Sequence, residues 1–309
     1  MRPPAHPDVD AAAGLLASLA GPDRPRGTEL DQVLYSWYLA MTPLPRRSGT
    51  PGPADVDLRG ALDAVHADAT HFVGGWLAQG VGREGEVLAV PRGAADDRRR
   101  LLTRGDYVVP GRTGLPAREG DPLVVRAAWT WIDDEHAFWY TRRGAWPPPG
   151  STHLVRTYLD VAPADAPRVI GALTRLLAGR RDVSYQLKTT VLRDHGGRAD
   201  AVVLYLGDHD ADALAGPLRV LVAGLADVLR PARPRFTEPL LEGVEGAGQA
   251  SAGLDGESFG QVVCDVLARC WEALEPAASG DAERVRTALV GALCAAGFDP
   301  EHPARGAAS

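Results

Sequence analysis

The chain has 309 residues, enough for one large domain or two modest ones, and 45% of them are hydrophobic, as in ordinary globular proteins. Its formal net charge of -7 at pH 7 argues against a nucleic-acid-binding protein that works by general attraction to phosphates. Because no long apolar stretch occurs and acidic residues precede the first short apolar run, we expect neither a signal peptide nor a membrane span.

The first part of the chain is predicted to be helical. Residues 8–41 contain two stretches with apolar side chains at helical spacing, the second being TELDQVLYSWYLAM. A loop rich in proline and glycine follows, and a third helix is predicted over residues 57–80. We therefore divide the chain into a helical region, residues 1–84, and an α+β domain, residues 85–309, with one continuous domain as the alternative.

From about residue 85 the pattern changes to short alternating segments separated by glycine and proline, which is typical of strands. The segments PLVVRAAWTWI and HAFWYTRR are predicted to form a hairpin. The segments THLVRTYLDV, VSYQLKTTVL and ADAVVLYLGD are predicted to be further strands, and two helices close the chain. This order predicts an α+β fold in which a mainly antiparallel sheet is packed by N-terminal and C-terminal helices.

Lys188, in DVSYQLKTTVL, is the only lysine of the chain, and all other basic residues of this sequence besides histidine are arginines. Arginine carries a permanent charge, whereas the pKa of a lysine amine falls readily on burial, so that lysine can accept a proton where arginine cannot. We therefore consider Lys188 a candidate base. The alternative is a lysine that drift has left on an exposed strand.

Side chains alternate across a strand, so the sequence also predicts which residues share a face. Arg156, Tyr158 and Asp160 share one face of their strand, and Gln186, Lys188 and Thr190 share one face of theirs. If these two strands are neighbours with the polar faces aligned, Arg156, Tyr158 and Lys188 converge in a pocket for a phosphate or a carboxylate. In the third strand the alternation places Arg198 and Asp200 on one face and Tyr205 on the other. A solvated face of a half-covered sheet would give the same pattern.

The sequence contains no recognisable metal or cofactor motif. His66 and His71 are five residues apart on a predicted helix, which does not place two ligands on one face. The three cysteines lack metal-ligand spacing and lie on apolar helical patterns, so we expect them to be reduced and largely buried, as in a cytoplasmic protein. We find no phosphate-binding glycine loop and no dinucleotide fingerprint, and we expect no cofactor.

Several stretches taken in order resemble the HopA family of type III effector-like proteins. They are LVRTYLDV, YQLKTTVL, RADAVVLYLG, PRFTEPLLEGV, ESFGQ and GFDPEHP, and the resemblance runs from the LYSWY helix to the C-terminus. The chain departs from the family pattern after SFG, where Gln261 stands in place of a basic residue.

The resemblance implies the lyase component of a class V lanthipeptide or thioamitide pathway. In such a pathway a separate kinase-like protein phosphorylates serine or threonine of a precursor peptide, and the lyase eliminates the phosphate to leave a dehydroamino acid. This chemistry needs a base for the α-proton, cations for the phosphate and an acid for the leaving oxygen. We assign Lys188 as the base, Tyr158 as a second catalytic residue and a candidate acid, and four further residues to phosphate and peptide binding: Arg156, Arg198, Gln186 and Tyr205.

Two other functions are compatible with the sequence. A scaffold of the same fold would grip the peptide while a partner does the chemistry, and arginine would serve it as well as lysine at position 188. An effector that acts on host proteins is disfavoured because nothing in the sequence marks secretion.

Overall fold

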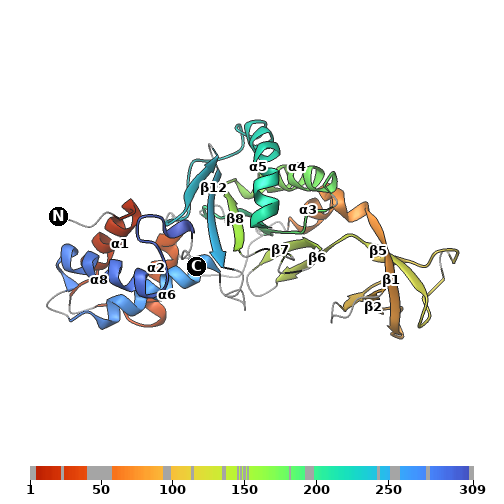
Figure 1. Ribbon diagram of the computed structural model, residues 1–309, viewed down its shortest axis with the longest axis horizontal. Coiled ribbons are helices and arrows are strands. Elements are labelled where there is room, and N and C mark those ends of the chain that lie inside the picture. The colour runs from red at the N-terminus through yellow and green to blue at the C-terminus, as the bar shows by residue number, and fades with distance from the viewer. Residues whose placement is uncertain are drawn as a thin grey trace.

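The protein is described here by a computed structural model. It describes residues 5–21, 24–39, 58–92, 99–112, 115–133, 137–144, 146, 148, 151, 153–180, 182–191, 198–241, 244–250, 258–275 and 279–305. Figure 1 shows three parts along the long axis: a group of helices at one end, a large sheet with helices above it in the middle, and a small sheet at the other end. The predicted α+β class with antiparallel sheets is confirmed.

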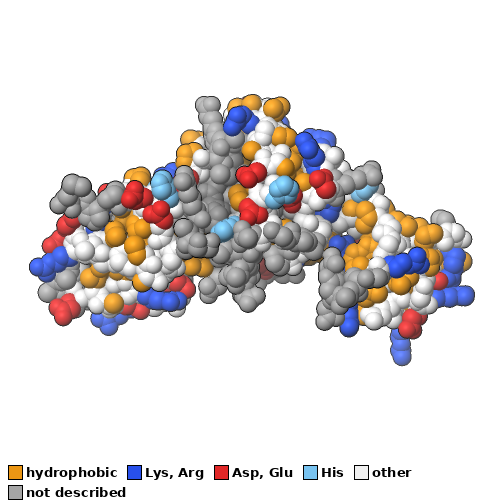
Figure 2. All heavy atoms as spheres, viewed as in Figure 1, with side chains coloured by type: hydrophobic (Ala, Val, Ile, Leu, Met, Phe, Trp, Pro, Cys, Tyr) orange, Lys and Arg blue, Asp and Glu red, His pale blue; other side chains and the backbone are white. Residues whose placement is uncertain are grey.

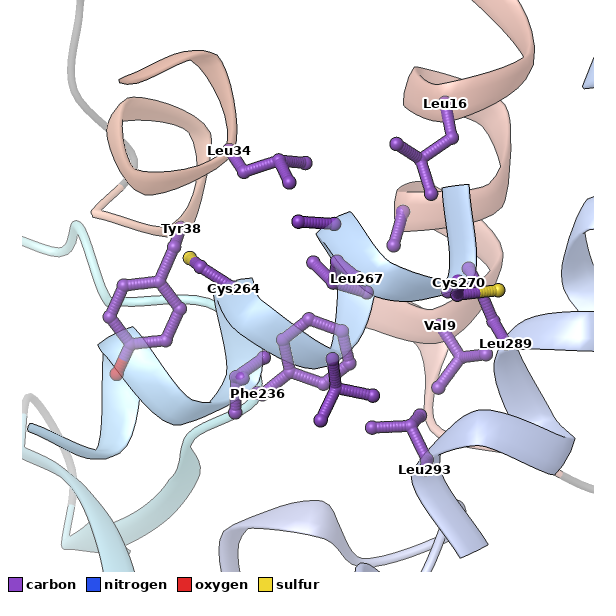
Figure 3. Close-up of a cluster of buried hydrophobic side chains, with 14 of the residues drawn as sticks. Val9, Leu16, Leu34, Tyr38, Phe236, Cys264, Leu267, Cys270, Leu289 and Leu293 are labelled. Carbon is purple, nitrogen blue, oxygen red and sulfur yellow. The ribbon is translucent and has the colours of Figure 1, made fainter. Parts of the chain in front are cut away.

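The group of helices brings the two ends of the chain together. It contains α1 (Pro7–Ser18), α2 (Thr28–Tyr38), α6 (Phe259–Ala273) and α8 (Ala282–Ala295). Their apolar stripes form one core, in which Leu34, Leu267 and Leu289 are fully buried (Figure 3). Two side chains of the large sheet, Tyr158 and Val203, belong to the same core. The helices therefore cover part of one face of that sheet.

The large sheet has seven strands in the order β11-β12-β8-β10-β9-β7-β6, and all its pairings are antiparallel. The strands are β6 (Ala128–Asp133), β7 (Phe138–Arg143), β8 (His153–Leu159), β9 (Tyr185–Thr190), β10 (Val202–Gly207), β11 (Glu238–Leu241) and β12 (Val244–Ala250). Its other face packs on α3 (Arg59–Val65), α4 (Ala166–Ala178) and α5 (Asp208–Ala223). Tyr185, Leu187 and Leu204 are fully buried there, as the alternation of β9 and β10 predicts.

The small sheet has five antiparallel strands in the order β3-β2-β1-β5-β4. They are β1 (Phe72–Val81), β2 (Val87–Pro91), β3 (Arg100–Leu102), β4 (Tyr107–Val108) and β5 (Pro122–Arg126). The sheet has a core of its own around Val87, Leu123 and Val125. Hydrophobic and basic side chains lie on the face of it that Figure 2 shows.

Two predictions for this part of the chain are wrong. The predicted third helix ends at Val65; a short 3₁₀ helix, η1 (Ala67–Thr70), follows, and then strand β1. The paired glycines of FVGGWLAQG disfavour a helix, and pairing with β2 and β5 decides the conformation. The segment PLVVRAAWTWI is not one strand either, because β5 joins the small sheet and only β6 forms the predicted hairpin with β7.

The division of the chain at residue 84 stays a prediction. Strand β1 precedes that position and pairs with β2 and β5, which follow it.

The cysteines are free, as predicted, and Cys264 and Cys270 are buried, but Cys294 is exposed on α8. No helix in the described part of the chain is long and apolar enough to cross a membrane.

Candidate active site

The register of the large sheet places the predicted site residues on one face. Lys188 on β9 lies opposite Tyr140 of β7 on one side and Val203 of β10 on the other, and Val203 lies opposite Tyr158 of β8. Residues that lie directly opposite one another in a sheet project to the same face. Lys188 and Tyr158 are therefore on one face, although β10 separates their strands, which the sequence did not predict.

A second row runs beside the first across the same four strands. Arg142 of β7 lies opposite Gln186 of β9, Gln186 opposite Tyr205 of β10, and Tyr205 opposite Arg156 of β8. The predicted candidates Arg156, Gln186 and Tyr205 thus share a row. Arg142 completes it, and the sequence reasoning missed this residue.

The second row, together with Tyr140 and Lys188 of the first, forms the floor of a cavity of about 340 Å³. Its lining includes Lys188, Arg156, Gln186 and Tyr205 of the predicted residues. Further lining residues come from the sheet, from the loop after β7, and from the helices that cover this face: Tyr35, Asp133, Phe138, Tyr140, Arg142, Trp146, Leu154, Ser258 and Gln261. Asp133 is the one carboxylate among the described lining residues, so that cations dominate the pocket.

Helix α6 begins at the rim of this pocket. Its N-cap Ser258 accepts a hydrogen bond from the backbone N–H of Gln261, and the Gln261 side chain accepts one from the backbone N–H of Ser258. Such a reciprocal cap fixes the helix start. Gln261 therefore has a structural role at the start of α6.

Lys188 has the properties of a base at near-neutral pH. Its Nζ lies 3.8 Å from the centre of the Phe138 ring, and it forms no salt bridge with a described carboxylate. Burial lowers the pKa of Lys188 from 10.5 to about 8, against the opposing effect of Asp200. A sizeable fraction of this amine is therefore unprotonated at mildly alkaline pH.

Arg156 is a buried cation with unused hydrogen-bond donors. Its side chain is 4% exposed, and Nε and Nη1 have no hydrogen-bond partner within the described part of the chain. Its guanidinium carbon lies 5.5 Å from the centre of the Tyr205 ring. Because a buried charge without a counter-ion is costly, this arrangement favours an anionic ligand.

The guanidinium of Arg142 is positioned by the side chain of Gln186 and by two tryptophan rings. Nε donates to Oε1 of Gln186 at 2.8 Å, and Nη2 donates to the same oxygen. The guanidinium carbon lies 4.9 Å from the ring centre of Trp146 and 5.2 Å from that of Trp131. Burial lowers the pKa of Arg142 to about 10.

The structure places the other two predicted residues at the edge of the site. Tyr158 packs into the helical core rather than lining the pocket, and burial raises its pKa to about 12. Arg198 forms a bidentate ion pair with Asp200, at 2.8 and 2.9 Å, and its guanidinium carbon lies 5.0 Å from the Phe138 ring centre. Arg198 is therefore already paired with a carboxylate, unlike Arg156.

The predicted separation of Arg198 and Asp200 from Tyr205 is wrong. Residues 198–201 precede β10 and do not follow its alternation. Arg198 contacts the same Phe138 ring as Lys188 and so lies on the Tyr205 side of the sheet.

The described residues contain no group of three or more histidine, cysteine, aspartate or glutamate side chains that could hold a metal. His66 is buried beside Trp139, with ring centres 5.6 Å apart, and burial lowers its pKa to about 4. It is a neutral packing residue at physiological pH.

Fold and site together define an α+β protein with a cationic pocket between an antiparallel sheet and the helices that cover it. The model of the HopA1 effector protein family matches residues 134–305, more than half of the chain, and the chain therefore belongs to this family. The predicted resemblance is confirmed.

Two solved structures share this fold across their whole length. The effector protein from Pseudomonas syringae pv. tomato strain DC3000 has a TM-score of 0.55 and 14% identity, over 97% of this chain and 98% of that one. The effector protein from Pseudomonas syringae pv. syringae strain 61 has a TM-score of 0.56 and 16% identity, over 98% and 97%. No curated protein matches the chain. At these identities the structures establish the fold and not the activity.

Proposed function

We propose that the protein is a phosphoserine/phosphothreonine lyase that acts on a ribosomally made precursor peptide in a lanthipeptide-like pathway. The observation that carries this proposal is that one pocket holds both Lys188 and Arg156. Lys188 is an amine with a pKa of about 8, and Arg156 is a buried guanidinium that no described residue neutralises. The first suits proton abstraction, and the second suits a phosphate.

The chemistry assigned to these residues is a β-elimination. Neutral Lys188 takes the α-proton of the phosphorylated residue, the electrons of that C–H bond form the Cα=Cβ double bond, and the Cβ–O bond breaks with release of phosphate. Arg156 holds the phosphate through its fork of N–H donors and stabilises the charge that develops on it.

Tyr205 is suited to donate a hydrogen bond to the leaving phosphate. Burial raises its pKa, so its hydroxyl stays protonated at physiological pH, and its ring lies beside the Arg156 guanidinium. Tyr158 is farther back, and a positioning role through the helical core suits it better than proton transfer.

The reaction requires a phosphorylated peptide, so the proposal includes a separate kinase-like protein that supplies it and a location in the cytoplasm with that partner. The alternative is a scaffold that grips the peptide while a partner does the chemistry. It is favoured by the same unpaired Arg156 but gives no reason for a lysine at position 188.

The two functions are separated by Lys188→Arg. This change keeps the charge but removes the proton acceptor, so we expect phosphopeptide binding to change little and elimination to collapse. Arg156→Lys loses the bidentate fork, and we expect weaker binding with a partial loss of rate, on the order of 1.5 to 3 kcal/mol. Both effects are measured from the mass of a pre-phosphorylated peptide after incubation and from its binding affinity.

Arg168→Gln is the matched control, because Arg168 is exposed and pairs with Asp227 outside the pocket. If Lys188→Arg eliminates phosphate as fast as the parent protein, Lys188 is not the base and the scaffold is the better account.

A further inference from the structure

Arg142 and its surroundings carry positive charge that the phosphate site at Arg156 does not account for. No described carboxylate forms an ion pair with Arg142, and its contacts are the side-chain oxygen of Gln186 and the faces of tryptophans. A glutamine oxygen orients the guanidinium but does not neutralise it. The fork is therefore held in position with donor capacity left over.

A second arginine adds to this charge. The guanidinium carbon of Arg100 lies 3.8 Å from the Trp129 ring centre, and that of Arg142 lies 5.9 Å from the same ring. Burial, and after it the charge of Arg142, lowers the pKa of Arg100 to about 10. No described carboxylate pairs with Arg100 either. Two like charges on one indole make the surroundings of Arg142 a place where an anion is stabilised.

The two cationic positions are separated by a distance that the register defines. Arg142 and Arg156 stand in one row with β9 and β10 between their strands, so their α-carbons are about 14 Å apart, three strand spacings. In an extended peptide, side chains on the same side recur about every 7 Å. A peptide that lies along the row with its phosphate at Arg156 presents the side chain four residues away to Arg142, because two such repeats span about 14 Å.

We propose that Arg142 is a second anion subsite, positioned by Gln186, which binds a negatively charged group four residues from the phosphoserine or phosphothreonine of the peptide. This proposal rests on the proposed function for the identity of the first anion. The second anion is an acidic side chain or another phosphorylated residue, since both offer the planar or trigonal oxygens that a guanidinium fork binds.

The test uses the full-length protein and peptides with phosphonomethylalanine, which lacks the bridging oxygen and therefore cannot be eliminated. Binding is measured for peptides with glutamate, glutamine or phosphoserine two, three or four residues from the phosphonate. We expect glutamate at four residues to tighten binding about tenfold over glutamine, phosphoserine there to tighten it further, and positions two and three to give no gain.

In Arg142→Gln the preference for a second anion should vanish, so that glutamate and glutamine peptides bind equally, whereas Arg168→Gln should keep it. A structural role for Arg142 would weaken both peptides alike and leave the preference intact. Arg142→Lys, which keeps the charge, should retain part of the preference and covers the case in which the glutamine variant does not fold.

The subsite is overturned if the parent protein binds glutamate and glutamine peptides equally, or if Arg142→Gln keeps the preference. Its failure is distinguishable from failure of the lyase. A parent protein that keeps the preference but never converts a phosphoserine peptide retains the subsite and loses the proposed activity. A parent protein that eliminates phosphate but binds glutamate and glutamine peptides equally retains the proposed activity and loses the subsite.

Discussion

The surroundings of Lys188 and Arg156 suit these two residues to different chemical roles. Arg156 is buried with unused donors, so its charge is stabilised only when an anion arrives. Lys188 is buried in a pocket that also holds Arg142 and Arg156, and burial lowers its pKa and favours its neutral form. One side chain is suited to hold an anion and the other to accept a proton.

The lowered pKa of Lys188 predicts the pH dependence of the reaction. Its folded pKa is about 8, below the ordinary 10.5, so the amine is mostly protonated at pH 7 and mostly neutral at pH 9. Elimination by the parent protein should rise with pH through about 8 and level off above it. The measurement is the rate of elimination at low phosphopeptide concentration between pH 7 and pH 9. Over this range the phosphate of the peptide is already ionised, because its second pKa is about 6. A flat profile between pH 7 and pH 9 would contradict the assignment of Lys188 as base.

The elements around the large sheet are joined by a buried polar network at Asp68 of η1. Its Oδ2 accepts from Arg143 Nη1 of β7 at 2.8 Å and from the Tyr185 hydroxyl of β9 at 2.7 Å. Arg143 Nη2 also donates to the Leu177 carbonyl at the end of α4 at 2.9 Å. The network ties η1 and α4 to two of the strands that carry the site.

Asp68→Asn should destabilise the protein by about 3 kcal/mol, because it leaves the guanidinium of Arg143 buried without its counter-charge. The measurement is the free energy of unfolding in denaturant. The control is Asp227→Asn, which breaks an exposed pair with Arg168 and should have little effect. Equal effects of the two changes would contradict the importance assigned to the buried network.

Local patterns predicted the strands that carry the site but not their arrangement. Alternation correctly placed Gln186 and Lys188 on one polar face, because one face of β9 is buried against helices. In the sheet, β10 lies between β8 and β9, and Arg142 lies beside Gln186. Both features result from pairing between segments that are distant in the sequence, and no local pattern predicts such pairing. The predicted helix over 57–80 failed at β1 because pairing with β2 and β5 outweighed the apolar spacing of that segment.

In the molecule as a whole, the small sheet has its own core, whereas the large sheet shares cores with helices from both ends of the chain. Arg100, stacked between Trp76 of β1 and Trp129 of β6, is a contact between the two sheets. Separate cores predict separate units of local unfolding.

Val125→Ala tests this separation, because Val125 is fully buried in the core of the small sheet. The cavity should cost about 2 kcal/mol, and amide hydrogen exchange should accelerate in β1, β2 and β5. Exchange in β9 and β10 should stay unchanged. Equal acceleration in all these strands would show that the two sheets unfold as one unit.

The most direct measurement of the central claim follows the α-deuteron of a phosphoserine peptide labelled at that position. Elimination at the Lys188 and Arg156 pocket predicts that the product loses phosphate and deuteron together, as dehydroalanine, and forms more slowly than from the unlabelled peptide. Mass spectrometry of the product distinguishes the outcomes. Serine that retains the deuteron would mean hydrolysis, and an intact phosphopeptide that stays bound would mean a scaffold; either result would contradict the lyase.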